Sequence, residues 1–146
     1  MKPAKGYSLL ELLVVILIVG IISGITIPVY SSYMERAQMA KVTVHFEESI
    51  RNTKHQFMKN QVNISAGLPS SLPTTSEGWI TTFNQMDIKA PKGGPAFVAN
   101  ASGDNHTGAG GVVVDSQTGS VIITRPAYLE LVKIQAEIDS SKVVYR

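Results

Sequence analysis

A long apolar run near the N-terminus is the strongest pattern in the chain. The nineteen residues 9–27 contain Glu11 as their only ionisable side chain, and Pro28 closes the run. At ~1.5 Å per residue, a helix of this length covers about 28 Å, close to the ~30 Å thickness of the hydrocarbon layer of a bilayer. The run therefore predicts a helix that can span a membrane.

After Pro28 the pattern becomes amphipathic. Apolar or small residues recur at helical spacing while charged side chains occupy the other faces. The recurring positions are Met39, Val42, Phe46, Ile50, Thr53 and Phe57. No Gly or Pro interrupts residues 29–62, so we expect one helix from residue 7 to about residue 59, roughly 80 Å long. Such a helix does not fit inside a globule of this chain length, and its apolar half is expected to protrude.

Residues 61–74 are rich in Ser, Pro, Gly and Thr, which predicts a loop. Thr74 and Glu77 then have the spacing of a capping box, so a short helix is expected over about residues 75–86, with Thr74 as its N-cap. The apolar residues of this helix are Trp79, Ile80 and Phe83. Because they share one face, we expect them to pack on the long helix, which favours a core role for Trp79 over a binding platform.

Short strand patterns fill the C-terminal part of the chain. Strands are expected over residues 96–100, 111–115, 120–124 and 142–145. The second and third flank a polar turn that ends in Gly119, so they should form an antiparallel hairpin. Residues 127–138 fit either a helix that starts at Pro126 or a strand over residues 129–134. The predicted fold class is α+β, with the long helix packed on a small antiparallel β-sheet head domain.

Charge and composition narrow the functional classes. The 13 basic side chains outnumber the 11 acidic ones only through Lys2 and Lys5, so bulk charge gives no support for nucleic-acid binding. The absence of cysteine removes disulfides, thiolate metal sites and cysteine nucleophiles. There is no Gly-x-Ser-x-Gly elbow, and the histidines His45, His55 and His106 lack the spacing of a metal-binding pair. We therefore predict neither an enzyme nor a bound metal or cofactor.

The glycine-rich segment 103–111 is a further candidate for a binding loop. It lacks the Lys-Ser/Thr pair of a phosphate-binding loop and the spaced acids of an EF-hand. We interpret it as a mobile or turn-rich surface loop.

Glu11 is a feature that an ordinary membrane anchor does not need. A carboxylate in hydrocarbon costs roughly a few kcal/mol unless it is paired or neutralised, so Glu11 requires a partner.

Residues 1–6, with Lys2 and Lys5, form a basic segment that is expected on the cytoplasmic side. No small-x-small site follows the apolar run, which disfavours a general secretory signal; an unprocessed single-pass anchor is the other alternative.

The N-terminal residues also carry a family resemblance. A short basic leader ending in Gly6, the aromatic Tyr7, Glu11 at the fifth position after that glycine and an unbroken apolar run resemble the N-terminus of type IV pilins and pseudopilins. The resemblance covers residues 5–33. It implies cleavage between Gly6 and Tyr7 by a prepilin peptidase and methylation of the new amine of Tyr7. Two features depart from the family pattern: Tyr7 stands where Phe is usual, and the cysteine pair common near pilin C-termini is missing.

The resemblance implies a three-part organisation and a function. Residues 1–6 are a leader that is removed, residues 7–59 are the long helix, with 9–27 as membrane span and filament core, and residues 60–146 are the globular head. The implied protein is a structural subunit of a type IV pilus-like filament for adhesion, motility or DNA uptake. It starts as an inner-membrane precursor and ends in an extracellular filament on the cell surface.

The implied partners are further copies of the chain in a helical homo-polymer, the prepilin peptidase, the inner-membrane pilus assembly machinery and, before assembly, the membrane. A minor pilin, a pseudopilin of a type II secretion-like machine and a membrane-anchored binding module are the alternatives.

Residues of the apolar run have two further expected roles. Cleavage gives Tyr7 a free amine, cationic at neutral pH, and Glu11 is expected to pair with this amine in the same subunit or in a neighbour.

Gly20, Gly24 and Pro28 recur at four-residue spacing, and each weakens a helix. One interpretation is close packing of helices on a small-residue face with a kink at Pro28. The other, which the resemblance implies, is a segment that loses helical hydrogen bonds in the filament.

Overall fold

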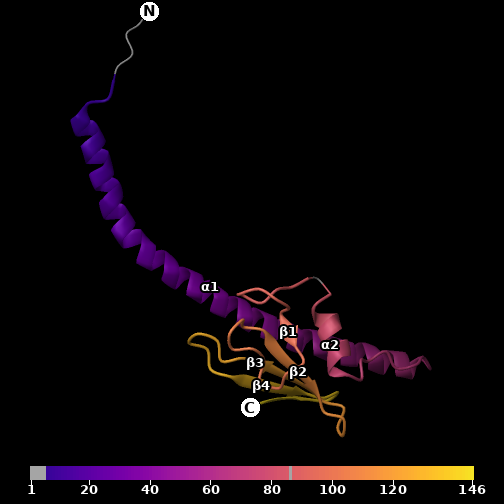
Figure 1. Cartoon of the computed structure of the whole chain (residues 1–146). Coiled ribbons are helices and arrows are strands. Elements are labelled where there is room, and N and C mark those ends of the chain that lie inside the picture. Colours follow the sequence, from indigo (N-terminus) through magenta and orange to yellow (C-terminus); the bar gives the residue numbers. More distant parts are fainter. Residues whose placement is uncertain (1–5, 86) are drawn as a thin grey trace, which may run out of the picture. The chain divides into compact units, whose positions relative to one another are not determined.

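The computed structural model describes residues 6–85 and 87–146 and contains two helices followed by five strands in its described part (Figure 1). Met86, expected at the end of the second helix, and leader residues 1–5 lie outside the described residues. The chain divides into two units, Met1–Arg36 and Ala37–Arg146.

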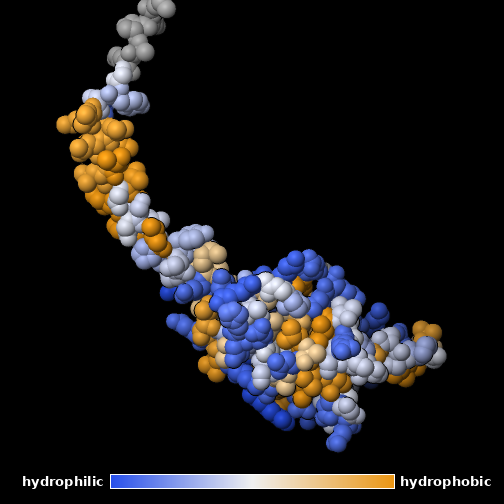
Figure 2. Space-filling model, in the orientation of Figure 1, coloured by the Kyte–Doolittle hydropathy of each residue, from blue (hydrophilic) through white to orange (hydrophobic). Residues whose placement is uncertain are grey.

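Helix α1 (Leu9–Ser65) carries both sequence patterns in one uninterrupted helix. In the unit that ends at Arg36, its apolar side chains are exposed, as the colouring in Figure 2 shows. In the unit that begins at Ala37, the face predicted to pack is buried, with Val42, Phe46 and Ile50 at most 6 % exposed. The amphipathic period therefore predicted the packed face correctly.

The end of α1 corrects the predicted loop over residues 61–74. Residues 61–65 are helical, and the helix ends at Ser65, just before Gly67, whose φ of 74° is in the left-handed region. Gly67 N donates to Ile64 O (3.0 Å) and Leu68 N donates to Asn63 O (2.9 Å), which is the Schellman pattern of a glycine-terminated helix. The glycine ends the helix, whereas the polar composition of residues 61–65 does not.

Helix α2 (Ser76–Phe83) is shorter than expected and starts one residue later. Its N-cap is Thr75, not Thr74: Thr75 Oγ1 accepts a hydrogen bond from Gly78 N (3.2 Å). Because the third helical residue is then Gly78, Glu77 is out of register for the reciprocal bond of a capping box. Trp79 is 1 % exposed, which confirms its predicted place in the core.

The five-stranded sheet has the order β1-β2-β3-β4-β5. Its strands are β1 (Phe97–Val98), β2 (Gly110–Val114), β3 (Val121–Arg125), β4 (Ile134–Ile138) and β5 (Val143–Tyr145). The predicted β2–β3 hairpin is confirmed, and β4 and β5 add antiparallel neighbours. The α+β class is confirmed, but the sheet is mixed, because β1 pairs with β2 in parallel.

The glycine-rich segment 103–111 makes this parallel pairing possible. Asp104 N donates to Ala109 O (2.8 Å) and Gly108 N to Asp104 O (2.9 Å), so the chain turns back on itself before entering β2. A Cβ on Gly108 would lie 3.0 Å from Val42 Cγ2, and Ala109 is 1 % exposed. The segment is turn-rich as predicted, and part of it packs against α1.

Residues 127–138 form neither the predicted helix nor a strand over 129–134. A turn occupies their first part, with Leu131 N bonded to Tyr128 O (2.9 Å) and Leu129 at a φ of 52°, a conformation that no helix accepts. The strand begins only at Ile134 and then alternates, with Ala136 and Ile138 fully buried. Pairing with β3 therefore overrides the helical period in this segment.

An aromatic row connects α1, α2 and the sheet. Successive ring centroids lie 6.0 Å apart for Phe57 and Trp79, 5.8 Å for Trp79 and Phe83, and 5.1 Å for Phe83 and Phe97. These tilted contacts suit aromatic pairs, each worth about 0.5–1.5 kcal/mol beyond the buried area. Helix α2 therefore fixes one end of the sheet to α1.

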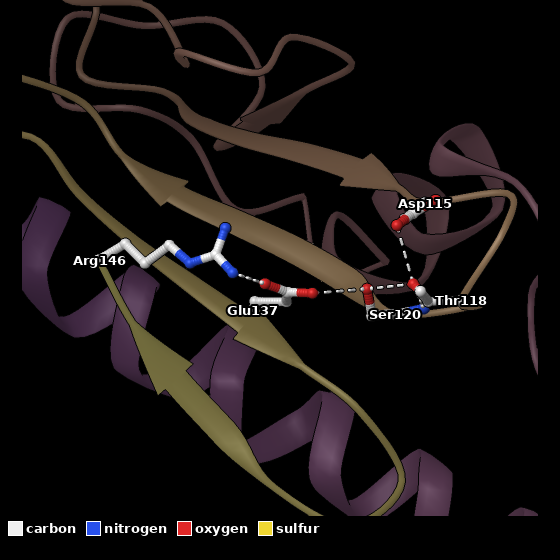
Figure 3. Close-up of polar contacts among 5 residues, drawn as sticks. All are labelled: Asp115, Thr118, Ser120, Glu137 and Arg146. Atoms are coloured by element: carbon white, nitrogen blue, oxygen red, sulfur yellow. Dashed lines mark hydrogen bonds and ion pairs between the residues drawn. The ribbon is translucent and has the colours of Figure 1, made fainter.

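A polar chain connects β4 to residues at the ends of β3 and β5 and to the β2–β3 turn, on the other face of the sheet (Figure 3). Arg146 Nη2 lies 3.0 Å from Glu137 Oε2, and Ser120 Oγ donates to Glu137 Oε1 (3.3 Å). The hydroxyls of Ser120 and Thr118 are 2.8 Å apart, and Thr118 Oγ1 donates to Asp115 Oδ2 (2.9 Å). The chain of contacts ties the C-terminal strand to the β2–β3 turn in a protein that has no cysteine.

The turn carboxylates predict acid sensitivity of the head. Hydrogen bonds from Gln117 N and the Thr118 hydroxyl lower the pKa of Asp115, and bonds from His106 N and the Thr107 hydroxyl lower the pKa of Asp104. Because both folded-state pKa values are lowered, their contribution to stability is complete above the ordinary value near 4 and is lost as pH falls through the folded values.

We expect the melting temperature of the full-length chain in detergent to fall as pH decreases below about 4. Asp115→Asn removes one titrating group, so it should flatten this dependence. Thermal melts recorded by circular dichroism from pH 6 to pH 2 measure both slopes. An identical slope for the variant and the natural chain would contradict the assignment.

Candidate functional site

The first turn of α1 gives Glu11 a partner within its own chain. Ser8 N and Ser8 Oγ both donate to Glu11 Oε2, at 3.0 and 3.1 Å, and Glu11 N donates to Ser8 Oγ at 3.2 Å. This reciprocal arrangement is a capping box, with Ser8 as N-cap and Glu11 as the third helical residue. The spacing Ser8-x-x-Glu11 before an apolar run is the sequence signal of this cap, which the sequence-based predictions for Glu11 do not include.

The capping box leaves part of the carboxylate available. All hydrogen bonds to Glu11 in the described ranges use Oε2, so Oε1 has no partner there. A carboxylate has about four lone-pair sites, and two donors from one serine do not satisfy them all. Glu11 can therefore keep its cap and still accept a bond from a cation outside the helix.

Gly6 and Tyr7 lie ahead of the helix, which begins at Leu9. Both are exposed and neither is in a helix or strand, so the bond between them is accessible to a protease. No hydrogen bond joins Tyr7 to Glu11 among the described residues, where the nitrogen of Tyr7 is still part of a peptide bond. The pairing of Glu11 with a free Tyr7 amine stays a prediction.

Gly20, Gly24 and Pro28 all lie within the continuous helix. Pro28 has no N–H, so Gly24 O loses its helical donor, and Thr26 Oγ1 bonds back to Ile22 O (2.8 Å). A Cβ at Gly20 or Gly24 would meet nothing within 4 Å. The packing of this chain alone therefore gives no steric reason for either glycine.

The apolar part of α1 has the length and composition of a membrane span. Its most apolar 18-residue window has a mean hydropathy of 2.8, lies near the N-terminus and contains no buried residue. Gly20 lies in an open hollow of about 440 Å³ whose other walls are the apolar side chains Leu13, Ile16, Leu17 and Ile21. Monomeric soluble proteins rarely expose a contiguous apolar surface of this extent, so this surface requires lipid or other helices to cover it.

The described residues contain no group of three histidine, cysteine or acidic side chains placed to hold a metal ion. The N-terminal site offers three features that another molecule can recognise: an accessible peptide bond, a capped acid and an uncovered apolar helix.

Residues 1–27 match the family model described as the prokaryotic N-terminal methylation motif. The N-terminus is therefore similar to those of prokaryotic proteins that carry this methylation motif. More particularly, the chain is similar to type IV pilins and fimbrial proteins, as three comparisons illustrate.

It is 27 % identical over 111 residues to the type IV major fimbrial protein FimA of Dichelobacter nodosus, covering 76 % of this chain and 61 % of that protein. It is 30 % identical over 105 residues to the type IV major pilin protein PilE1 of Neisseria gonorrhoeae, covering 69 % and 56 %. A fimbrial protein of Moraxella nonliquefaciens is 44 % identical over 41 residues, covering 28 % and 27 %.

The chain spans about half the length of the curated relatives it matches, with 61, 42 and 56 % of the first three covered. No solved structure matches the chain. The likeness to type IV pilins is thus established by the N-terminal motif and by these relatives.

Proposed function

We propose that this chain is a structural subunit of a type IV pilus-like filament and that it assembles through the apolar half of α1. The observation that carries the proposal is the coincidence of the N-terminal methylation motif with an exposed apolar helical segment, residues 9–27, that holds one acid, Glu11. The relatives named above are major pilins or fimbrial proteins, which favours a major subunit over a minor pilin or a pseudopilin.

The apolar helix suits two environments in succession. In the inner membrane, lipid covers residues 9–27, and the hydrophobic effect does not drive one helix towards another because the tails are as apolar as the side chains. In a filament outside the membrane, neighbouring helices replace the lipid. Apolar contacts alone do not fix the axial position of one helix along its neighbour. The position of each new subunit therefore requires a directional interaction.

Glu11 is our candidate for that interaction. Cleavage after Gly6 by a prepilin peptidase gives Tyr7 a free amine that stays cationic after methylation. In the low dielectric between packed helices, an unpaired carboxylate and an unpaired amine are both costly. Because Ser8 occupies only Oε2, Oε1 is open to the amine of the same subunit or of a neighbour. A bond to a neighbour would also set the axial register.

The first prediction concerns processing. The intact mass of the mature chain should correspond to a start at Tyr7 with one added methyl group. Gly6→Ile should leave the precursor uncleaved in the inner membrane, because a bulky side chain replaces hydrogen beside the cleaved bond. Mass spectrometry of sheared filaments and of membranes tests both statements, and a mature chain that begins at Met1 or beyond Ile27 would refute them.

The second prediction separates the two roles of Glu11. Glu11→Leu should allow membrane insertion and cleavage but give few or no filaments, because the amine loses its partner. Ser8→Ala is the matched control: it removes the helix cap, worth about 1 kcal/mol, and keeps the carboxylate. We expect Ser8→Ala to form filaments, counted by electron microscopy of sheared material. Filaments at natural abundance from Glu11→Leu, or equal loss in both variants, would exclude the pairing role.

The third prediction concerns Gly20, Gly24 and Pro28. We infer that residues 20–28 lose helical hydrogen bonds in the assembled filament, because three weak helix formers stand where this chain shows no steric need for the glycines. A filament reconstruction should show non-helical backbone over residues 20–28, and the double variant Gly24→Ala with Pro28→Ala should extend the helix through it. Unbroken helical density in the natural filament would contradict this inference.

A further inference from the structure

Arg125 is a charged residue at an inward position of β3. Val121 and Ile123 point towards α1 and are fully buried, so the period of two places the side chain of Arg125 on the same inward face. Its Nη2 donates to Val132 O (3.1 Å), whereas its Nε is buried without a hydrogen-bond partner among the described residues. A buried N–H donor without an acceptor is costly, so the half-buried Arg125 guanidinium is only partly satisfied within the described residues.

Arg125 lines a cavity of about 430 Å³ between α1 and the sheet. Arg51 and Lys54 of α1 line the same cavity, and Glu47 is its only acidic residue. All of its lining residues belong to the unit Ala37–Arg146. The cavity thus brings together two arginines and a lysine from a helix and a strand that are far apart in the sequence.

The positive charge of this cavity is not balanced within the chain. The ion pairs of the described ranges are Lys89 with Asp87 and Arg146 with Glu137, so none of the three cavity cations is paired there. Like charges repel more strongly where protein replaces part of the water around them. An anion in the cavity would offset this repulsion.

We propose that this cavity binds an organic carboxylate carried on a hydroxylated ring, the chemistry of an acidic sugar. Guanidinium groups match a carboxylate in shape and bond it with two parallel N–H donors. The apolar wall includes Phe46 and Tyr145, and the Tyr145 side chain is 62 % exposed, so a ring has a surface on which to lie.

Two further groups distinguish a sugar acid from a simple inorganic anion. The Thr43 hydroxyl donates to Met39 O (3.1 Å), which leaves its lone pairs free to accept a bond. The Glu47 carboxylate also accepts hydrogen bonds only, so it favours hydroxyl donors and repels a fully anionic ligand such as phosphate. The mixed lining therefore fits one carboxylate and several hydroxyls. This proposal does not depend on filament assembly.

The test uses the purified full-length chain in detergent, with glucuronate as the probe and glucose as its neutral counterpart. Isothermal titration calorimetry should show saturable binding of glucuronate and none of glucose. Arg51→Gln should weaken glucuronate binding at least about tenfold, because one charge-assisted bond is lost. Lys59→Gln removes the same charge from an exposed position of α1 outside the cavity, and it should leave binding unchanged.

Three results would overturn the proposal: no saturable binding of glucuronate, equal weakening by Lys59→Gln and Arg51→Gln, or displacement of glucuronate by inorganic phosphate at equal concentration. Arg51 is exposed, so its replacement leaves the core intact, and the Arg51→Gln chain should still be cleaved after Gly6 and form filaments. Loss of binding with filaments intact separates this site from the assembly function.

Discussion

The uncovered apolar surface of residues 9–27 is the constraint on which the rest of the structure depends. Covering a Leu, Ile or Val side chain is worth roughly 1.5–3 kcal/mol relative to water, so this run in water would cost on the order of tens of kcal/mol. A folded domain is stable by only about 5–15 kcal/mol. The head cannot offset such a cost, and the chain therefore requires lipid or another apolar surface to cover this run.

The head domain is built to hold one side of the same helix. The face that contains Val42, Phe46 and Ile50 is buried, and the aromatic row from Phe57 to Phe97 anchors α2 and the sheet to it. At the start of this unit, the Tyr128 hydroxyl donates to Gln38 Oε1 (2.8 Å). The two parts of one helix thus differ in burial: the first part exposes its apolar side chains, and the second part is the centre of a globular core.

Much of this arrangement follows from periodicity, but the exceptions depend on interactions distant in the sequence. The buried face of α1 and the β2–β3 hairpin were predictable because local spacing determines them. The direction of β1 was not, because strand pairing depends on where residues 99–109 return the chain. The strand β4 was misplaced because Leu129 adopts a positive φ that no local pattern indicates.

The candidate sites also divide into those determined by local sequence spacing and those determined by contacts between distant residues. Gly6, Tyr7 and Glu11 are recognisable from sequence, because the motif is local. The Ser8 cap is equally local, because its signal is the spacing Ser8-x-x-Glu11, but it was not among the predictions for Glu11. The cavity lined by Arg125 could not be predicted from the sequence. The inward position of Arg125 is apparent only when the bounds of β3 are known, and the other two cations of the cavity, Arg51 and Lys54, lie on α1.

The polar chain from Asp115 to Arg146 fastens the last strand with groups that cannot be oxidised or reduced. Its integrity is therefore insensitive to the redox poise of the compartment, and a chemical reductant has no bond to break in the head. Salt weakens the ion pair of Arg146 and Glu137 instead, because exposed charges such as the Arg146 guanidinium are screened within about 10 Å at an ionic strength of 0.1 M. This protein can complete its fold without an oxidation step on either side of a membrane.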